Sequence, residues 1–210
     1  MKLRYYPLLL ALTLAACARN NELIEGGVYT TRSACPIVGI PAATGDMTLF
    51  NPPSSRDAAA IDVTATITNL RATCQETADQ IVSTATFDVL AIRRDATQAR
   101  QVVLPFFDAA VQGGTQVVAK RVGQVGLNFP AGGYRAQTRA QATIRVSRAA
   151  ATLPDNVRQI LTRNRRPGDA DAAVDPLTDP GVRAAVARAT FEHLIGFQMS
   201  NDQLRYNATR

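Results

Sequence analysis

The chain has 210 residues and a formal charge of +6, with 46% hydrophobic residues, no tryptophan, one histidine and three cysteines. This length suits one domain with appendages and is enough to bury a hydrophobic core. The positive charge comes mostly from arginine in an alanine-rich sequence, a composition typical of GC-rich genomes, so it does not by itself indicate a nucleic-acid-binding protein.

The first seventeen residues have the layout of a secretory signal. Lys2 and Arg4 precede an apolar run from Leu8 to Leu14, and small residues then lead to Cys17. A membrane-spanning anchor needs about 20 apolar residues. Polar residues resume at Arg19, so this run is too short to span a bilayer. An ordinary signal peptide and a lipoprotein signal remain as the alternatives.

The ending Leu14-Ala15-Ala16-Cys17 resembles the lipobox of bacterial lipoproteins. The resemblance implies that residues 1–16 are a signal peptide that is removed, and that the Cys17 thiol carries lipid chains that hold the protein at a membrane. The layout is also similar to that of uncharacterised envelope lipoproteins of alphaproteobacteria, a likeness that implies location and no activity. Ala18, rather than Asp, follows the cysteine, which favours the periplasmic face of the outer membrane.

Cys35 and Cys74 are the two cysteines that remain once Cys17 is assigned to lipid. An even pair in an exported, oxidising compartment predicts a disulfide between them. The chain has a single histidine and no Cys-x-x-Cys motif, so we expect neither a metal site nor a cofactor.

Residues 17–34 form a polar tether after the lipidated cysteine, and residues 35–148 predict a domain of strands. An extended segment covers 36–41, and a short strand covers 47–50. In the next strand, from Ile61 to Cys74, apolar and polar residues alternate with period two. The phase of this alternation slips at Asn69, which predicts a β-bulge.

Four further strands are expected in this domain, over 81–92, 101–111, 115–129 and 134–146. Pro105 interrupts the second of them and should lie at an edge or a bulge, because proline cannot donate to a ladder. In the last strand the even-numbered residues from Tyr134 to Val146 are apolar or small. The odd-numbered residues are polar and include Arg135, Arg139 and Arg145. This pattern predicts an antiparallel strand with one wet face.

These strands predict a mainly β fold, an immunoglobulin- or fibronectin-like antiparallel β-sandwich with a C-terminal helical extension over 149–210. The likeness is one of architecture, because the tryptophan that packs on the disulfide of true immunoglobulin domains is missing.

After Ser147 the period becomes helical. A short helix is expected over 154–162, then a mobile Pro-, Gly- and Asp-rich loop over 163–180. Asp179 and Pro180 should begin a second helix near 180–199. Its apolar stripe, which would dock either on the sandwich or on a partner, is Val182, Val186, Ala189, Leu194 and Phe197. The tail over 203–210 is mostly polar.

No catalytic motif stands out: the chain has no Gly-x-Ser-x-Gly, no phosphate loop and no dinucleotide fingerprint. His193 is expected on a half-buried helix surface, with Glu192 pointing elsewhere. The acidic loop should pair with nearby arginines rather than bind calcium; its residues are Asp169, Asp171, Asp175 and Asp179, and the arginines are Arg163, Arg165 and Arg166. We therefore expect a protein that is not an enzyme.

The sequence thus predicts a noncatalytic protein of the cell envelope, of structural or protein-interaction type, held at the membrane by its lipid. It would bind another envelope protein through a sheet edge or the C-terminal helix. An alternative is that Arg135, Arg139 and Arg145 bind an anionic polysaccharide, lipopolysaccharide or peptidoglycan. The same arginines also fit a soluble outer face that has no ligand. The absence of tryptophan favours a protein partner over a sugar ligand. Nucleic acid is not an expected partner.

Overall fold

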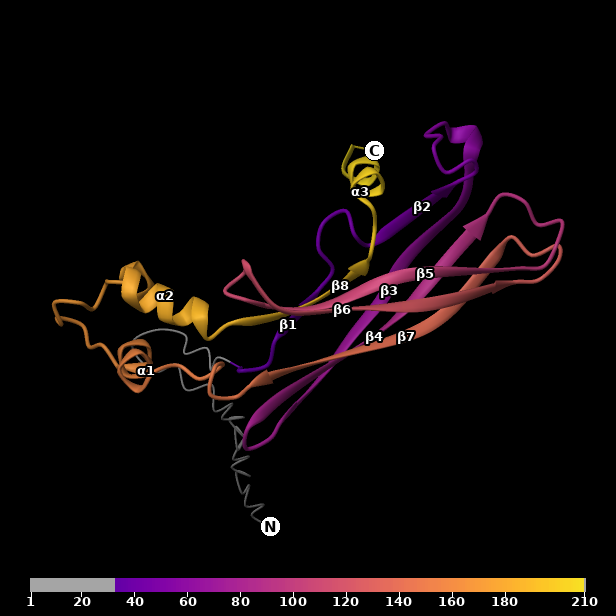
Figure 1. Cartoon of the computed structure of the whole chain (residues 1–210). Helices are drawn as coiled ribbons and strands as arrows, with labels where there is room; N and C mark the ends of the chain where they lie inside the picture. The colour runs from indigo at the N-terminus through magenta and orange to yellow at the C-terminus, as the bar shows by residue number, and fades with distance from the viewer. Residues whose placement is uncertain (1–32, 210) are drawn as a thin grey trace, which may run out of the picture.

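The computed structural model describes residues 33–209, which form two packed four-stranded sheets (Figure 1). The first sheet has the order β1-β8-β5-β6 and the second has the order β2-β3-β4-β7. The strands are β1 (Ile37–Gly39), β2 (Asp46–Phe50), β3 (Ile61–Glu76), β4 (Gln80–Arg93), β5 (Arg100–Gln112), β6 (Gln116–Phe129), β7 (Arg135–Ser147) and β8 (Phe191–Phe197). The helices are α1 (Asp155–Thr162), α2 (Pro180–Arg188) and α3 (Asn201–Thr209), with 3₁₀ turns η1 (Ala58–Ala60) and η2 (Pro176–Thr178).

The expected signal segment, Cys17 and most of the expected tether lie outside the described residues. Over residues 33–209, none of the helices is both long and apolar enough to cross a membrane.

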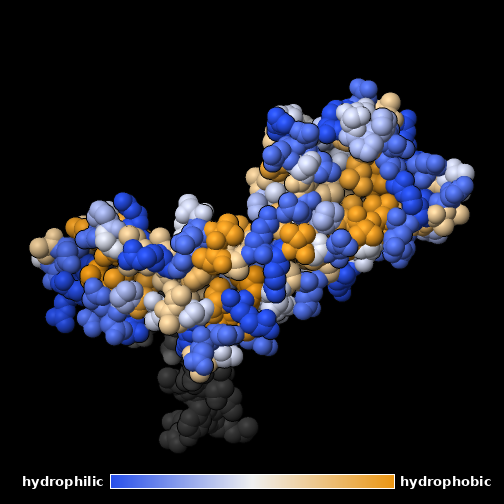
Figure 2. Space-filling model, in the orientation of Figure 1, coloured by the Kyte–Doolittle hydropathy of each residue, from blue (hydrophilic) through white to orange (hydrophobic). Residues whose placement is uncertain are grey.

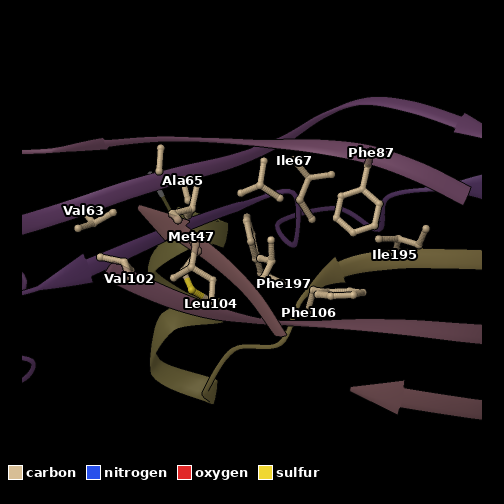
Figure 3. Packing of buried hydrophobic residues seen from close by; sticks show 14 of the residues in the cluster. Met47, Val63, Ala65, Ile67, Phe87, Val102, Leu104, Phe106, Ile195 and Phe197 are labelled. Atoms are coloured by element: carbon tan, nitrogen blue, oxygen red, sulfur yellow. The ribbon is translucent and has the colours of Figure 1, made fainter. Parts of the chain in front are cut away.

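The main core lies between the two sheets, where inward side chains of both meet (Figure 3). Val63, Ala65 and Ile67 of β3 face Leu104 of β5 and Phe197 of β8 across the interface. The rings of Phe87 and Phe106 meet edge to face, with centroids 5.3 Å apart, an arrangement that aromatic pairs favour. The mainly β sandwich with a C-terminal helix that the sequence predicts is confirmed.

The predicted bulge in β3 is confirmed at Asn69. The register with β4 shifts between Thr68 and Arg71, and Asn69 has a positive φ of 51°. A bulge inserts one residue and changes which face the following side chains occupy. Past the bulge, Cys74 lies opposite Ser83 of β4.

Pro105 differs from its prediction, because β5 lies inside its sheet and not at an edge. The proline lies one residue beyond the stretch of β5 that pairs with β8, which begins at Phe106. Its carbonyl oxygen accepts a hydrogen bond from the backbone of Gln198, just after β8 ends. The N and O atoms of one strand residue point to the same side, so the missing donor falls where the neighbouring strand has stopped.

Strand β7 has the predicted alternation from Ala136 to Val146, with even-numbered residues turned inward and odd-numbered residues exposed except for the half-buried Thr143. Tyr134 is an exception: it precedes the strand and is 58% exposed. The expectation that Tyr134 belongs to the buried face is therefore wrong.

The predicted helix over 180–199 is the main error in the C-terminal part. Asp179 caps α2 as expected, accepting from the backbone of Gly181 and Val182. The helix ends at Arg188, however, and residues 191–197 form β8 between β1 and β5. Aromatic and branched residues alternate in β8 and fill the core, while its backbone pairs on both sides, so tertiary burial overrides the helical spacing. The sandwich therefore includes a strand from the segment that was expected to be helical.

The polar tail forms α3, within the predicted helical extension, and packs near β2. The ring of Tyr206 meets that of Phe50 edge to face at 5.1 Å. The Asn207 side-chain amide donates to the backbone oxygens of Ala43 and Asp46.

Cys35 and Cys74 form a disulfide, in agreement with the predicted pair. The bond joins the segment before β1 to β3. Strand β1 then pairs in parallel with β8 of the other sheet. The start of the domain is thereby connected to both layers of the sandwich.

Candidate functional site

A cationic cleft opens between β6 and β7. These two strands follow one another along the chain but belong to different sheets, and they separate from their common turn towards the β5–β6 turn (Figure 1). A cavity of about 230 Å³ lies between them. Its lining residues are Asp108 of β5, Ala119, Lys120 and Arg121 of β6, and Thr143, Ile144 and Arg145 of β7.

Three cationic residues and one acidic residue are among those that line the cleft, so the formal charge of its lining is positive. An Arg121 nitrogen, Nη2, lies 2.6 Å from Oδ2 of Asp108, whose side chain is buried. The Lys120 ammonium lies 4.9 Å from the centre of the Phe107 ring. Arg145 has no hydrogen bond or ion pair to any of residues 33–209. Two cations therefore remain without an ionic partner in the described part of the chain.

Two fully buried polar side chains, Ser83 and His193, lie behind the lining of this cleft: Ser83 is opposite Ile144, a lining residue, in the register between β4 and β7. Oγ of Ser83 is 3.1 Å from Nδ1 of His193. Nε2 of His193 has no hydrogen-bond partner among the described residues. Burial lowers the pKa of His193 below its ordinary value of 6.5; the Asp108 carboxylate opposes this effect, and the Arg121 charge adds to it. The imidazole is therefore neutral at pH 7.

Serine, histidine and aspartate are the residue types of acyl-transfer centres, where the base contacts the nucleophile through Nε2 and the carboxylate through Nδ1. Here the serine contacts Nδ1, and the Asp108 carboxylate binds Arg121. Ser83 and His193 are 1% and 0% exposed and do not line the cleft. They form a buried hydrogen-bonded pair.

The expectation for His193 is therefore wrong in position. The side chain is buried in β8 rather than half-buried on a helix. Glu192 does point elsewhere, because neighbouring residues of a strand face opposite sides.

The three arginines of β7 are all exposed, as predicted, but they do not form a single free row. Nε of Arg139 lies 2.8 Å from Oδ1 of Asp88, and Asn69 donates to the other oxygen. The hydrogen bond from Arg139, and then that from Asn69, hold the pKa of the Asp88 carboxyl below its ordinary value. Arg145 lines the cleft, and Arg135 lies at the opposite end of the strand.

The aspartates of the acidic loop form ion pairs and hydrogen bonds with groups close to them in sequence. Arg163 pairs with Asp169 and Asp171, and Arg165 pairs with Asp171. The remaining two aspartates accept hydrogen bonds at the starts of helical turns, Asp175 at η2 and Asp179 at α2. In the part of the chain that the structure describes, no three His, Cys, Asp or Glu side chains gather as a metal site.

Sequence reasoning missed Asp108, Lys120 and Arg121. For Asp108 a signal existed in the strand pattern. Val102, Leu104 and Phe106 mark the inward phase of β5, and Asp108 continues that phase. A carboxylate at an inward position needs a partner when it is buried. The two cations of β6 carry no such signal, because that part of the strand is exposed on both faces.

Comparison with protein-family models, with curated proteins and with solved structures finds no match to this chain.

Proposed function

We propose that this protein is a lipid-anchored, noncatalytic component of the bacterial cell envelope whose β-sandwich binds another envelope protein. The observation that carries the anchor is Leu14-Ala15-Ala16-Cys17 behind a charged and then apolar start. The disulfide between Cys35 and Cys74 supports export, because such bonds persist in oxidising compartments. Ala18 supports the periplasmic face of the outer membrane as the location.

The edge strand β6 supports binding to a protein. Residues 116–122 are exposed, and Val117 and Val122 are 58% and 57% exposed. Long exposed edges with apolar side chains invite pairing with another chain. On the face shown in Figure 2, hydrophobic surface is exposed in several places and is bordered by hydrophilic residues.

A second candidate is binding of an anionic polysaccharide, lipopolysaccharide or peptidoglycan. The positive cleft, which includes Arg145, favours it. The engagement of Arg139 with Asp88 weakens it, because the proposed row of arginines loses its middle member.

The anchor is tested by replacing Cys17→Ser and following palmitate labelling and membrane fractionation. We expect both labelling and membrane retention to be lost. The matched control is the double variant Cys35→Ser, Cys74→Ser, which should keep the label because it leaves the proposed lipid site intact. Undiminished labelling of the Cys17→Ser protein would contradict the proposal.

A further inference from the structure

We propose that the groove between β6 and β7 binds an extended acidic segment of the partner, which adds to the free edge of β6 as a further strand. This inference rests on the proposed function, because it takes the partner to be a protein. It assigns a ligand class to the cationic cleft.

Strand β6 has a free edge. Strand β6 is the last in its sheet and pairs only with β5. Within residues 33–209, no strand pairs with its other edge. In a strand, alternate residues present N–H and C=O groups to each side. An added peptide can pair with the groups on the open side and gain affinity from main-chain hydrogen bonds.

Open space lies beside that edge. Ala119–Arg121 of β6 and Thr143–Arg145 of β7 line the same cavity. Strand β7 belongs to the other sheet and does not pair with β6. The open groove therefore gives an incoming segment access to the β6 edge.

The positive charge of the residues around the groove favours an acidic occupant. Lys120 and Arg121 lie on the edge strand, and Arg145 of β7 lines the same cavity. A segment with carboxylate side chains complements these cations. Pairing with β6 of a second copy brings like charges together, which natural edge strands use to prevent self-association.

Apolar side chains around the cleft favour a peptide ligand over a polysaccharide. Val117, Val118 and Val122 stand exposed beside the cations of β6, and a strand that alternates acidic and apolar residues matches both kinds of side chain. No aromatic ring is among the residues that line the cleft. The nearby Phe107 ring is covered by the Lys120 ammonium, so no open stacking surface is offered to a sugar.

The test uses the full lipidated protein in detergent and titrates four probes at fixed ionic strength. The first is a synthetic peptide of about ten residues that alternates glutamate and valine. The second is the same peptide with every backbone amide N-methylated, which keeps its charge and removes strand pairing. The third replaces glutamate by lysine, and the fourth is polygalacturonate of matched charge. Amide chemical shifts of β6 report the site.

We expect the glutamate peptide to bind with shifts centred on residues 116–122. N-methylation should weaken binding by about tenfold or more, and so should Lys120→Glu or Arg145→Glu. The lysine peptide should not bind. Arg135→Glu is the matched control on the same face of β7, outside the cleft, and should change affinity by less than about twofold. Melting curves establish that each variant is folded, and the two cleft variants serve as independent tests.

Two results overturn the inference. One is no binding of the glutamate peptide to the folded protein. The other is that the N-methylated peptide and polygalacturonate both bind as tightly as the glutamate peptide, which would favour the polysaccharide alternative. Neither result affects the outcome of the Cys17→Ser experiment. A failure of the proposed peptide site can therefore be distinguished from a failure of the proposed envelope anchor.

Discussion

His193 couples the stability of the sandwich to pH. Its pKa is lowered in the folded protein, chiefly by burial. Between its folded-state pKa and about 6.5, the unfolded chain binds a proton that the folded chain does not. Stability is therefore unaffected by this group above pH 6.5 and falls as pH drops below it, by up to about 1.4 kcal/mol per pH unit.

We expect urea unfolding at pH 7.5, 6.5 and 5.5 to show this loss in the natural protein. The comparison is His193→Asn, whose side chain keeps a polar atom near Ser83 and does not titrate. Its free energy of unfolding should change less over the same range. Equal slopes for the two proteins would mean that His193 does not carry the pH dependence. The lowered pKa of Asp88 acts in a lower pH range.

Arg93 is a buried cation held by backbone carbonyls. Its guanidinium donates to the oxygens of four loop residues, Ala96, Gln98, Pro130 and Gly133. It also lies over the Phe129 ring, 5.1 Å from the centroid. These contacts join the loop after β4 to the loop after β6.

Replacing Arg93→Met should lower the free energy of unfolding by about 3 kcal/mol, because it leaves carbonyl groups without donors in a dry environment. The neighbouring Arg94 is exposed and donates to one carbonyl, that of Ala59, so Arg94→Met should cost less than about 1 kcal/mol. Chemical denaturation of the two variants makes the comparison. Similar losses would argue against the role assigned to Arg93.

At the scale of single elements, β7 gives a direct test of strand phase. Ile144 is buried and Arg145 is exposed. Ile144→Asp places an unpaired charge in the core and should cost several kcal/mol, whereas Arg145→Asp should stay within about 0.5 kcal/mol. Comparable melting temperatures would mean that the strand is not oriented as described.

Strand β8 is the element that completes the sandwich from the C-terminal side. Truncation after Arg148 removes it, and with it the core residues Phe191, Ile195 and Phe197. We expect that protein to lose its cooperative unfolding transition. Truncation after Met199 removes only α3 and should leave a folded protein, destabilised by about 1–3 kcal/mol through loss of Tyr206. Circular dichroism melting curves distinguish the two outcomes, and a folded product of the first truncation would contradict the assignment.

Periodicity predicts the strands from β3 to β7 well, because each is long enough for period two to show. It fails at 180–199, where the spacing of Val182, Val186 and Ala189 is helical and continues by coincidence into Leu194 and Phe197. Residues 191–197 form a strand because β1 and β5 leave room for one between them in the sheet. A single sequence does not reveal that position. The inward polar residues Ser83 and Arg93 share the phase of Phe87 and Val89, so phase alone marks them as buried.

At the scale of the whole molecule, the two-layer sandwich follows from the alternating strands and the cysteine pair. The cationic cleft does not, because it arises where two neighbouring strands enter different sheets. Lys120 and Arg145 are far apart in sequence, and only the divergence of β6 from β7 places them around one cavity. A pattern within one strand carries no information about that divergence.

The disulfide also determines how a mechanical load would travel through the molecule. Strand β1 has three residues and pairs with a single neighbour, so by itself it would peel away under tension from the chain that precedes it. Cys35 comes before β1 and is covalently joined to Cys74 in the sixteen-residue strand β3. Force applied ahead of Cys35 therefore first reaches a long strand that pairs with β4 along most of its length. Reduction of the bond would shift that force to the three-residue strand β1.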